Sequence, residues 1–325
     1  MGKKNKKKRP GSGYLEYLAV LCLVRFVSLL SYRLASDMGG RLGRIAYFGD
    51  ARHRHVTLKN LQRAFPDKDI RSITLIAKKA FENIGRSAGE FIYIATRRPK
   101  GLLPTLYEWV TIEGRTNLDK AAERGKGIIY LTAHFGNWEL LGLSLGANGY
   151  PLNVIMRPLD NPKIDRLLTS FRSITGARMI PKKGALKEVL KQLRNGKGLA
   201  ILIDQNTSRD EGVFVDFFGT PAATSKGLAL MSIKTDTPVL PTFLIREGKY
   251  RHRLIYGQEI PIHKSGDTGR DVVLNTGNVT RVVESYIRRY PEQWFWMHQR
   301  WKTRPVETEE KSEVRRKKQE VRSKK

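Results

Sequence analysis

The stretch GIIYLTAHFGNWELLGL, residues 127–143, decides the fold. It opens with a short apolar run, Gly127 to Ala133, whose β-branched residues indicate a central strand in a sheet covered on both faces. Asn137 can cap a helix that continues to Gly142 without a breaker. The stretch therefore predicts a strand, a sharp turn and a helix, with His134 in the turn at the carboxyl end of the strand.

His134 and Glu139 lie five residues apart across this turn. Ligands of open α/β sheets bind outside the carboxyl ends of the strands, and an imidazole paired with a carboxylate can deprotonate a hydroxyl. A structural interpretation stands beside this one, because the helix dipole favours a glutamate in a first turn whether or not it is catalytic. The spacing alone leaves both interpretations open.

The chain beyond the turn alternates between strand and helix patterns. This rhythm predicts an α/β fold with a mixed, largely parallel sheet flanked by helices. A second group of strands, at 213–217, 239–245 and 250–256, is expected to extend the sheet. No GxGxxG fingerprint and no P-loop pattern occurs in the sequence, so nothing indicates a nucleotide cofactor. The first group comprises strands at 152–156, 178–180 and 198–203, and helices at 162–175 and 185–195.

The chain is strongly basic. It contains 60 lysines and arginines against 31 acidic residues, and of the formal charge of +29, +20 remains on residues 11–305 once the two termini are set aside. Such a field attracts nucleic acid, an anionic membrane, a phosphorylated lipid or an acidic carrier protein, and charge alone does not choose among them. The single cysteine, Cys22, rules out a disulfide framework within the chain and a thiolate metal site. Neither a metal nor another cofactor is expected.

An apolar segment, Leu15 to Leu34, follows a lysine-rich start. It is long enough to span a bilayer, but Glu16, Arg25 and Arg33 interrupt it. A true span and an interfacial anchor are both compatible with this pattern, and a buried helix of a soluble protein is the structural alternative. The expected organisation is a basic tail at 1–13, a hydrophobic membrane-anchoring helix at 14–36, one domain at 37–305, and a charged tail at 306–325.

The string HFGNWE, residues 134–139, resembles the signature of the lysophospholipid acyltransferase superfamily. Its residues are similar to those of the late acyltransferases of lipid A biosynthesis, the Kdo2-lipid IVA lauroyl and myristoyl type. Four later blocks resemble that branch in order and approximate spacing, so that the resemblance covers roughly residues 14 to 305. These blocks are residues 156–162, 203–206, 213–224 and 290–305.

The resemblance implies acyl transfer from an acyl carrier protein thioester to a hydroxyl of a lipid A precursor, a phosphorylated glycolipid. His134 would act as the general base, and Glu139 would orient the imidazole and stabilise its positive charge. Backbone amides of the turn or helix start after His134 would stabilise the oxyanion. The implied location is the inner membrane, with the domain facing the cytoplasm and no nucleic-acid partner.

Residues at the ends of other strands are candidates for binding the substrates. Arg157 could grip a phosphate through its guanidinium, and Arg172 on the following helix could join it. Asp204 could bind a sugar hydroxyl or hold Arg157, or could merely cap a loop. The expected substrate-binding residues are therefore Asn137, Arg157, Arg172, Asp204 and Gln205.

Two alternatives remain at this stage. The same catalytic pair could serve another lipid acceptor, such as a glycerophospholipid, an amino-acid lipid or a mannosylated lipid. The chain could instead be a non-enzymatic protein that binds membranes or nucleic acid through its charge. Trp294, Phe295, Trp296 and Trp301 could form an interfacial belt or a stacking surface, although rings of this kind are also common in cores.

Overall fold

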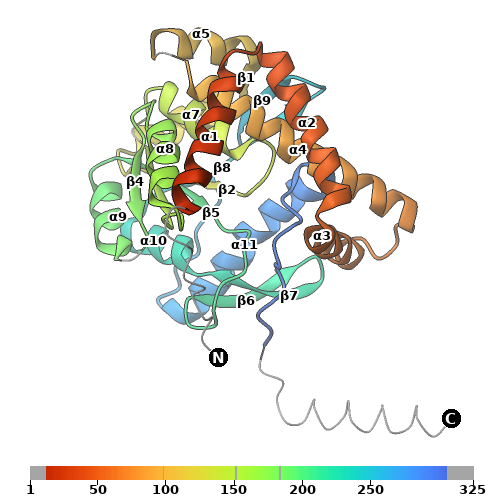
Figure 1. Ribbon diagram of the computed structural model, residues 1–325. Helices are drawn as coiled ribbons and strands as arrows, with labels where there is room; N and C mark the ends of the chain where they lie inside the picture. Colours follow the sequence, from red (N-terminus) through yellow and green to blue (C-terminus); the bar gives the residue numbers. More distant parts are fainter. Residues whose placement is uncertain (1–11, 98, 151, 183, 306–325) are drawn as a thin grey trace, which may run out of the picture.

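The sheet is mixed and largely parallel, as predicted. In the computed structural model, which describes residues 12–97, 99–150, 152–182 and 184–305, seven strands follow the order β1-β9-β8-β2-β5-β3-β4 (Figure 1). Neighbouring strands run parallel except β8 and β9, which are antiparallel. The strands are β1 (Val110–Glu113), β2 (Ile128–Thr132), β3 (Leu152–Met156), β4 (Arg178–Pro181), β5 (Gly198–Leu202), β8 (Val239–Glu247) and β9 (Arg251–Tyr256).

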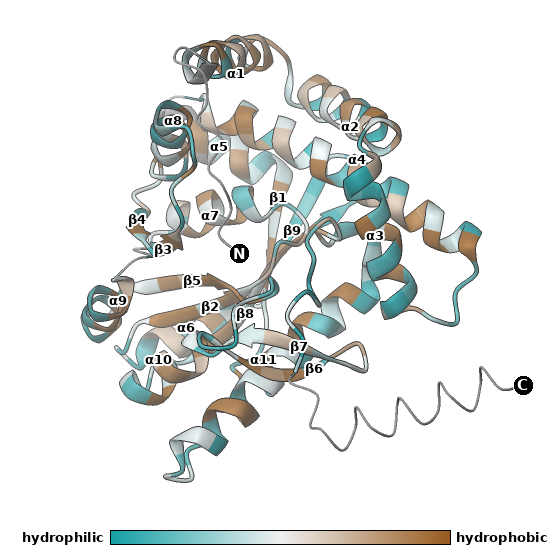
Figure 2. Ribbon diagram, turned by 60° about the horizontal axis from the view of Figure 1, so that its bottom comes forward, coloured by the Kyte–Doolittle hydropathy of each residue, from teal (hydrophilic) through white to brown (hydrophobic). Residues whose placement is uncertain are grey.

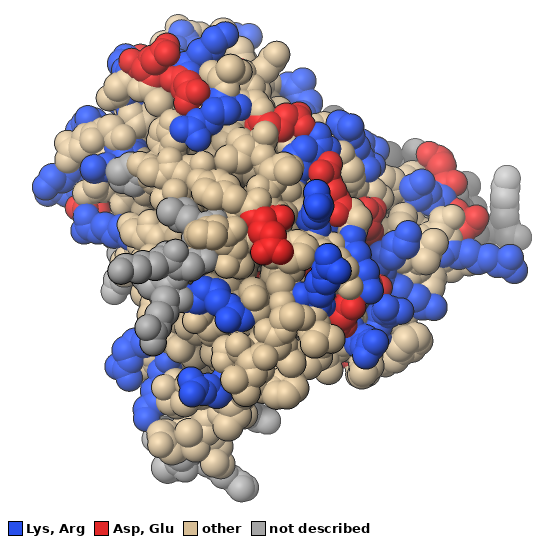
Figure 3. Space-filling view, turned by 90° about the horizontal axis from the view of Figure 1, so that it is seen from above, with Lys and Arg blue, Asp and Glu red and all other residues tan. Residues whose placement is uncertain are grey.

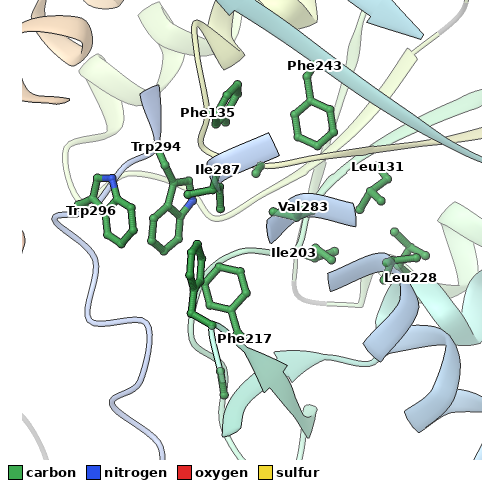
Figure 4. Packing of buried hydrophobic residues seen from close by; sticks show 14 of the residues in the cluster. Leu131, Phe135, Ile203, Phe217, Leu228, Phe243, Val283, Ile287, Trp294 and Trp296 are labelled. Carbon is green, nitrogen blue, oxygen red and sulfur yellow. The ribbon is translucent and has the colours of Figure 1, made fainter. Parts of the chain in front are cut away.

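Helices cover both faces of the sheet (Figure 2). Alternate side chains of β2 point to opposite faces: Leu131 packs into the cluster with α9, α10 and α11 (Figure 4), whereas Tyr130 packs against α6 and α7. Every residue of β2 is buried, which explains its continuous apolar run. The helices are α1 (Ser12–Ser28), α2 (Tyr32–Gly49), α3 (Ala51–Ala64), α4 (Ile70–Ala95), α5 (Pro99–Trp109), α6 (Arg115–Glu123), α7 (Trp138–Ala147), α8 (Pro162–Arg172), α9 (Ala185–Arg194), α10 (Gly227–Thr235) and α11 (Thr268–Arg289).

The segment 14–36 is not the single helix that its apolar run predicts. Helix α1 ends at Ser28 and α2 begins at Tyr32. The side chain of Ser31 caps α2 by accepting a hydrogen bond of 3.3 Å from the backbone N–H of Leu34. Within the described residues, no helix combines the length and the apolar character that crossing a bilayer requires. The expectation of one anchoring helix over 14–36 is therefore corrected to two shorter helices.

Helices α2 and α4 touch backbone to backbone. A Cβ atom added to Gly39 would lie 2.2 Å from the carbonyl oxygen of Gly85, and one added to Gly85 would lie 2.1 Å from that of Gly39. Gly43 and Gly89 make equally close approaches one turn further along on either side. Only glycine permits this spacing. The contact fixes α2 firmly on α4, the helix that supports the turn after β2.

Strand 213–217 does not extend the main sheet, contrary to expectation. It forms β6 (Gly212–Phe217), which pairs antiparallel with β7 (Thr220–Ser225) as a separate hairpin packed against α11. The two-residue turn between them, Phe218 and Gly219, has positive φ at both positions (56° and 70°), as the twist of a tight hairpin requires.

Candidate active site

His134 is held by Asp204. The Nδ1 atom of the imidazole lies 3.0 Å from Oδ1 of Asp204, and the backbone N–H of His134 donates to Oδ2 at 3.0 Å. Strands β2 and β5 pair in parallel, so their carboxyl ends meet at one edge and bring the two residues together. A carboxylate can only accept, so Nδ1 carries the proton and Nε2 keeps its lone pair. This tautomer leaves Nε2 able to accept a proton.

Protein groups engage both oxygens of Asp204. Its side chain is buried, and the indole Nε1 of Trp294 donates to Oδ2 at 2.8 Å, in addition to the two bonds from His134. Asp204 does not hold Arg157, because its hydrogen bonds come from His134 and Trp294, and its binding of a sugar hydroxyl stays a prediction. Its position orients the histidine.

The electrostatics of the pair raise the pKa of His134. Burial alone would lower the pKa of His134, but the charge of Asp204 and its hydrogen bond outweigh burial and raise that pKa. Burial likewise opposes ionisation of Asp204, and the positive charge and hydrogen bonds of His134 hold its pKa below the ordinary value. The pair can therefore stabilise the imidazolium that forms when Nε2 takes a proton.

Glu139 does not orient the imidazole. It lies in the first turn of α7, and its two carboxylate oxygens accept hydrogen bonds of 2.8 and 2.5 Å from the guanidinium of Arg172 in the last turn of α8. Burial lowers the pKa of His134; the charge of Glu139 acts with Asp204 to raise it, although its effect is smaller than that of Asp204. The orienting role predicted for Glu139 thus belongs to Asp204, because α7 turns the glutamate toward α8.

The predicted arginine pair is not formed. Arg172 is engaged by Glu139, whereas Arg157 is exposed in the loop after β3 and makes no hydrogen bond or ion pair with any described residue. Gln205 does reach the site: its amide Nε2 lies 3.2 Å from Nε2 of His134. Arg157 thus stands free to contact a ligand, and Gln205 lies directly beside the base.

Asn137 has a structural role. Its Oδ1 caps α7 by accepting from the N–H of Leu140 at 3.1 Å, which agrees with the predicted cap. Its Nδ2 donates to Glu90 at 3.0 Å and to the carbonyl of Ser87 at 3.3 Å, and the residue is completely buried. The expectation that Asn137 contacts substrate is corrected, since all its polar atoms bond within the protein.

Glu90 on α4 supports the turn through its hydrogen bond with Asn137. The sequence patterns did not indicate this role for Glu90. This fully buried carboxylate also accepts from the guanidinium of Arg246 on β8 and, at 2.7 Å, from the hydroxyl of Ser36 on α2. Burial would raise the pKa of Glu90, but the charges and hydrogen bonds of Arg246 and His252 together lower it. The charge of Glu90 is therefore compensated, and the cap at Asn137 is tied to three other elements.

Most backbone amides of the turn are already engaged. The N–H of Phe135 donates to Ala133 at 2.7 Å, and the N–H of Gly136 donates to Gln293 at 2.9 Å. The amides of Trp138 and Glu139, at the start of α7, have no acceptor among the described residues. Of the backbone N–H groups expected to stabilise the oxyanion, those at the start of α7 therefore stay as candidates, and those of Phe135 and Gly136 do not.

The aromatic block near the carboxyl terminus belongs to this site. Trp294, Trp296 and Trp301 are buried, with exposed fractions of 1%, 0% and 6%, and the first two pack into the core shown in Figure 4. The backbone N–H of Phe295 donates to the carbonyl of His134 at 2.9 Å, and its ring centre lies 6.2 Å from the imidazole centre. Three of the rings are thus core, and the fourth borders the histidine.

Residues 3–303 match the family model of the bacterial lipid A biosynthesis acyltransferases. The chain belongs to this family. It is therefore an acyltransferase, and the alternative of a non-enzymatic binding protein is set aside.

Relatives of this acyltransferase differ in their named acceptors. It is 28% identical to a lipid A biosynthesis acyltransferase of Haemophilus influenzae, over 89% of each chain. It is 26% identical to the lipid A biosynthesis palmitoleoyltransferase of Escherichia coli, over 85% of this chain and 88% of that one. It is also 26% identical to a phosphatidylinositol mannoside acyltransferase of Mycobacterium tuberculosis, over 88% and 87%.

Proposed function

We propose that the enzyme moves an acyl chain from an acyl carrier protein thioester to a hydroxyl of a lipid A precursor of the Kdo2-lipid IVA type. The observation that carries the proposal is the Asp204–His134 pair, which leaves Nε2 of the imidazole as a proton acceptor. Nε2 takes the hydroxyl proton while the hydroxyl oxygen attacks the thioester carbonyl carbon. The C–S bond then breaks, and the imidazolium returns the proton to the leaving thiolate.

The negative charge on the carbonyl oxygen needs a stabilising partner. We assign this role to the N–H groups of Trp138 and Glu139 at the amino end of α7, because free amides there point outward and carry the positive end of the helix dipole. The side-chain amide of Gln205 donates to the lone pair of Nε2 at 3.2 Å, so the attacking hydroxyl would take the place of this hydrogen bond. The ion pair of Glu139 and Arg172 borders the same space, and Arg157 is a candidate contact for the acceptor headgroup.

We further propose that the enzyme works at the inner membrane, on the cytoplasmic side. Helices α1 and α2 expose large apolar side chains that a lipid surface would cover. On the face shown in Figure 3, lysines and arginines outnumber acidic residues and surround a broad uncharged area, which suits both anionic lipid and an acidic carrier protein. The exposed residues are Leu15, Leu21, Leu23 and Phe26 on α1, Leu29 in the link between the two helices, and Leu34, Leu42, Ile45 and Phe48 on α2.

Another lipid acceptor remains the second candidate. The similarity to a phosphatidylinositol mannoside acyltransferase supports it, because that relative is about as similar to this chain as the named lipid A enzymes are. Both candidates use the same base and the same donor chemistry. They differ only in the lipid that enters beside Gln205.

A panel of donors and acceptors separates the candidates. Purified enzyme would receive acyl carrier protein thioesters of several chain lengths, with acyl-coenzyme A as the rival donor. The acceptors would be the lipid A precursor, a lysophospholipid and a phosphatidylinositol mannoside. We expect transfer from the carrier protein to the lipid A precursor. Transfer only to a rival acceptor would show that the proposed acceptor is wrong. Transfer only from acyl-coenzyme A would show that the proposed donor is wrong.

A further inference from the structure

A basic cavity of about 420 Å³ lies between the start of α3 and the segment that follows α11. It is distinct from the contacts that orient His134, although it lies beside them. Its volume is in the range of ligand pockets and would accommodate a phosphate together with part of a sugar. The polar residues that line this basic cavity are Arg52, His53, Asn206, His298, Gln299 and Lys302.

Hydrogen bonds within the protein hold the wall of the basic cavity in place, and the wall adjoins His134. Asn206 follows Gln205 in the chain, and its side chain is locked by two hydrogen bonds with Thr303, of 3.0 and 2.9 Å. On the opposite side, the amide of Asn60 in α3 donates to the carbonyls of Trp296 and His298, both at 2.8 Å. A ligand in this cavity would therefore be held at a fixed position relative to His134.

The charge in the basic cavity is not compensated. Arg52 and Lys302 are both exposed, and neither forms an ion pair with a residue of the part of the chain that the structure describes. The carboxylate of Asp50, which caps α3, is already occupied, because it accepts from the backbone N–H of His53 at 3.0 Å and lies 2.6 Å from the imidazole Nδ1 of His53. Two cations that line one cavity and form no ion pair with a described residue favour an anionic ligand.

His298 adds an unsatisfied polar atom to the basic cavity. Its Nδ1 is buried and has no hydrogen-bond partner among the described residues. Burial also lowers the pKa of this histidine, which favours its neutral form. A buried polar atom without a partner costs free energy, and a ligand oxygen within reach of an Nδ1–H would remove that cost.

The surroundings of the basic cavity favour a lipid as the source of the anion. Leu42, Ile45 and Phe48 stand three residues apart along α2 with exposed fractions of 52%, 65% and 67%, so they form one apolar stripe. The stripe ends four residues before Arg52. We propose that the basic cavity binds a phosphate monoester on the headgroup of the lipid acceptor, while its acyl chains lie along α2; this proposal rests on the proposed function above.

The double variant Arg52→Gln/Lys302→Gln tests the proposal. Its control is Lys187→Gln/Lys191→Gln on α9, where both lysines are exposed and make no ion pair with a described residue, so the loss of charge is equal. The KM for the phosphorylated acceptor should rise about tenfold or more in the cavity variant and stay unchanged in the control. The KM for the acyl donor should not change. Wild type should prefer the phosphorylated over the dephosphorylated acceptor, and the cavity variant should lose this preference.

A binding measurement keeps this test separate from the proposed function. Glucosamine 1-phosphate would be titrated into wild type and both double variants, with glucosamine as the ligand that lacks phosphate. We expect phosphate-dependent binding by wild type and control, and binding weaker by about tenfold or more in the cavity variant. This result would support the basic cavity even if the lipid A precursor were not acylated. Equal binding by all three proteins, no binding by wild type, or a raised KM for the donor alone would overturn the proposal.

Discussion

Replacing Asp204 by asparagine should separate the orientation of His134 from the shape of its surroundings. Asparagine has almost the same size, but it lacks the negative charge and turns one oxygen into an N–H donor. An amide nitrogen facing Nδ1 would favour the tautomer with the proton on Nε2, where the base must be free. The indole of Trp294 and the backbone of His134 can still donate to the remaining oxygen. The variant should fold and lose turnover.

The expected loss follows from the two effects of Asp204 on the imidazole. The variant removes the charge that raises the pKa of His134, and it removes the acceptor that holds Nδ1–H at 3.0 Å. Where a carboxylate orients a catalytic histidine in this way, its conversion to the amide lowers kcat by as much as about 10⁴-fold. We therefore expect a loss of about 10² to 10⁴-fold in kcat, or about 2.7 to 5.4 kcal/mol of transition-state stabilisation.

The assay is steady-state acyl transfer at saturating donor and acceptor. Asp210→Asn is the matched control, because Asp210 follows in the same loop, is exposed and makes no hydrogen bond with a described residue. The control should retain wild-type kcat, and both variants should melt cooperatively near the wild-type temperature. A kcat for Asp204→Asn within a few-fold of wild type, in a folded protein, would refute the role of this carboxylate.

Burial lowers the pKa of His134, but Asp204 outweighs this effect and raises it. The value of kcat/KM should therefore rise with pH and reach half its maximum above about pH 6.5, the ordinary pKa of histidine. A midpoint below that pH would argue against His134 as the base. Gly85→Ala would place a Cβ 2.1 Å from a carbonyl oxygen of α2 and should lower the free energy of unfolding by about 1 to 3 kcal/mol, measured by denaturation. Gly49→Ala is the control: its Cβ would meet nothing within 4 Å, so this variant should be neutral or slightly stabilising in the same experiment. Glu139→Gln should weaken the half-buried contact with Arg172 and cost about 1 kcal/mol or less of stability. Its kcat should fall by less than about 10²-fold, and a larger loss would return Glu139 to direct participation.

The local part of the site could be predicted from the sequence because its signals are local. The apolar run before His134, the cap at Asn137 and the start of the helix lie within 127–143, and the structure confirms each of them, with the helix continuing to Ala147. The orienting partner could not be chosen in this way. Asp204 reaches His134 only because β5 pairs with β2, and strand order is a property of the assembled sheet. The spacing to Glu139 offered a nearer but incorrect partner.

Tertiary contacts also explain the differences at the amino terminus. The apolar run Leu15 to Leu34 has no strong internal breaker, yet the chain stops one helix at Ser28 and caps the next with Ser31. The new direction allows α2 to bury its glycines against α4, a contact between residues about 46 positions apart that sequence periodicity does not report. The bond from Trp294 to Asp204, which spans 90 residues, escaped the sequence patterns for the same reason.

Acyl transfer by His134→Ala is the measurement that tests the central claim most directly. Purified wild type and variant would be compared with acyl carrier protein thioester and lipid A precursor, after thermal melting has shown that both are folded. The account predicts robust transfer by wild type and a loss of about 10² to 10⁴-fold in the variant, the range expected when a general base is removed. Equal transfer by the two proteins would contradict the account, because it would remove His134 as the base.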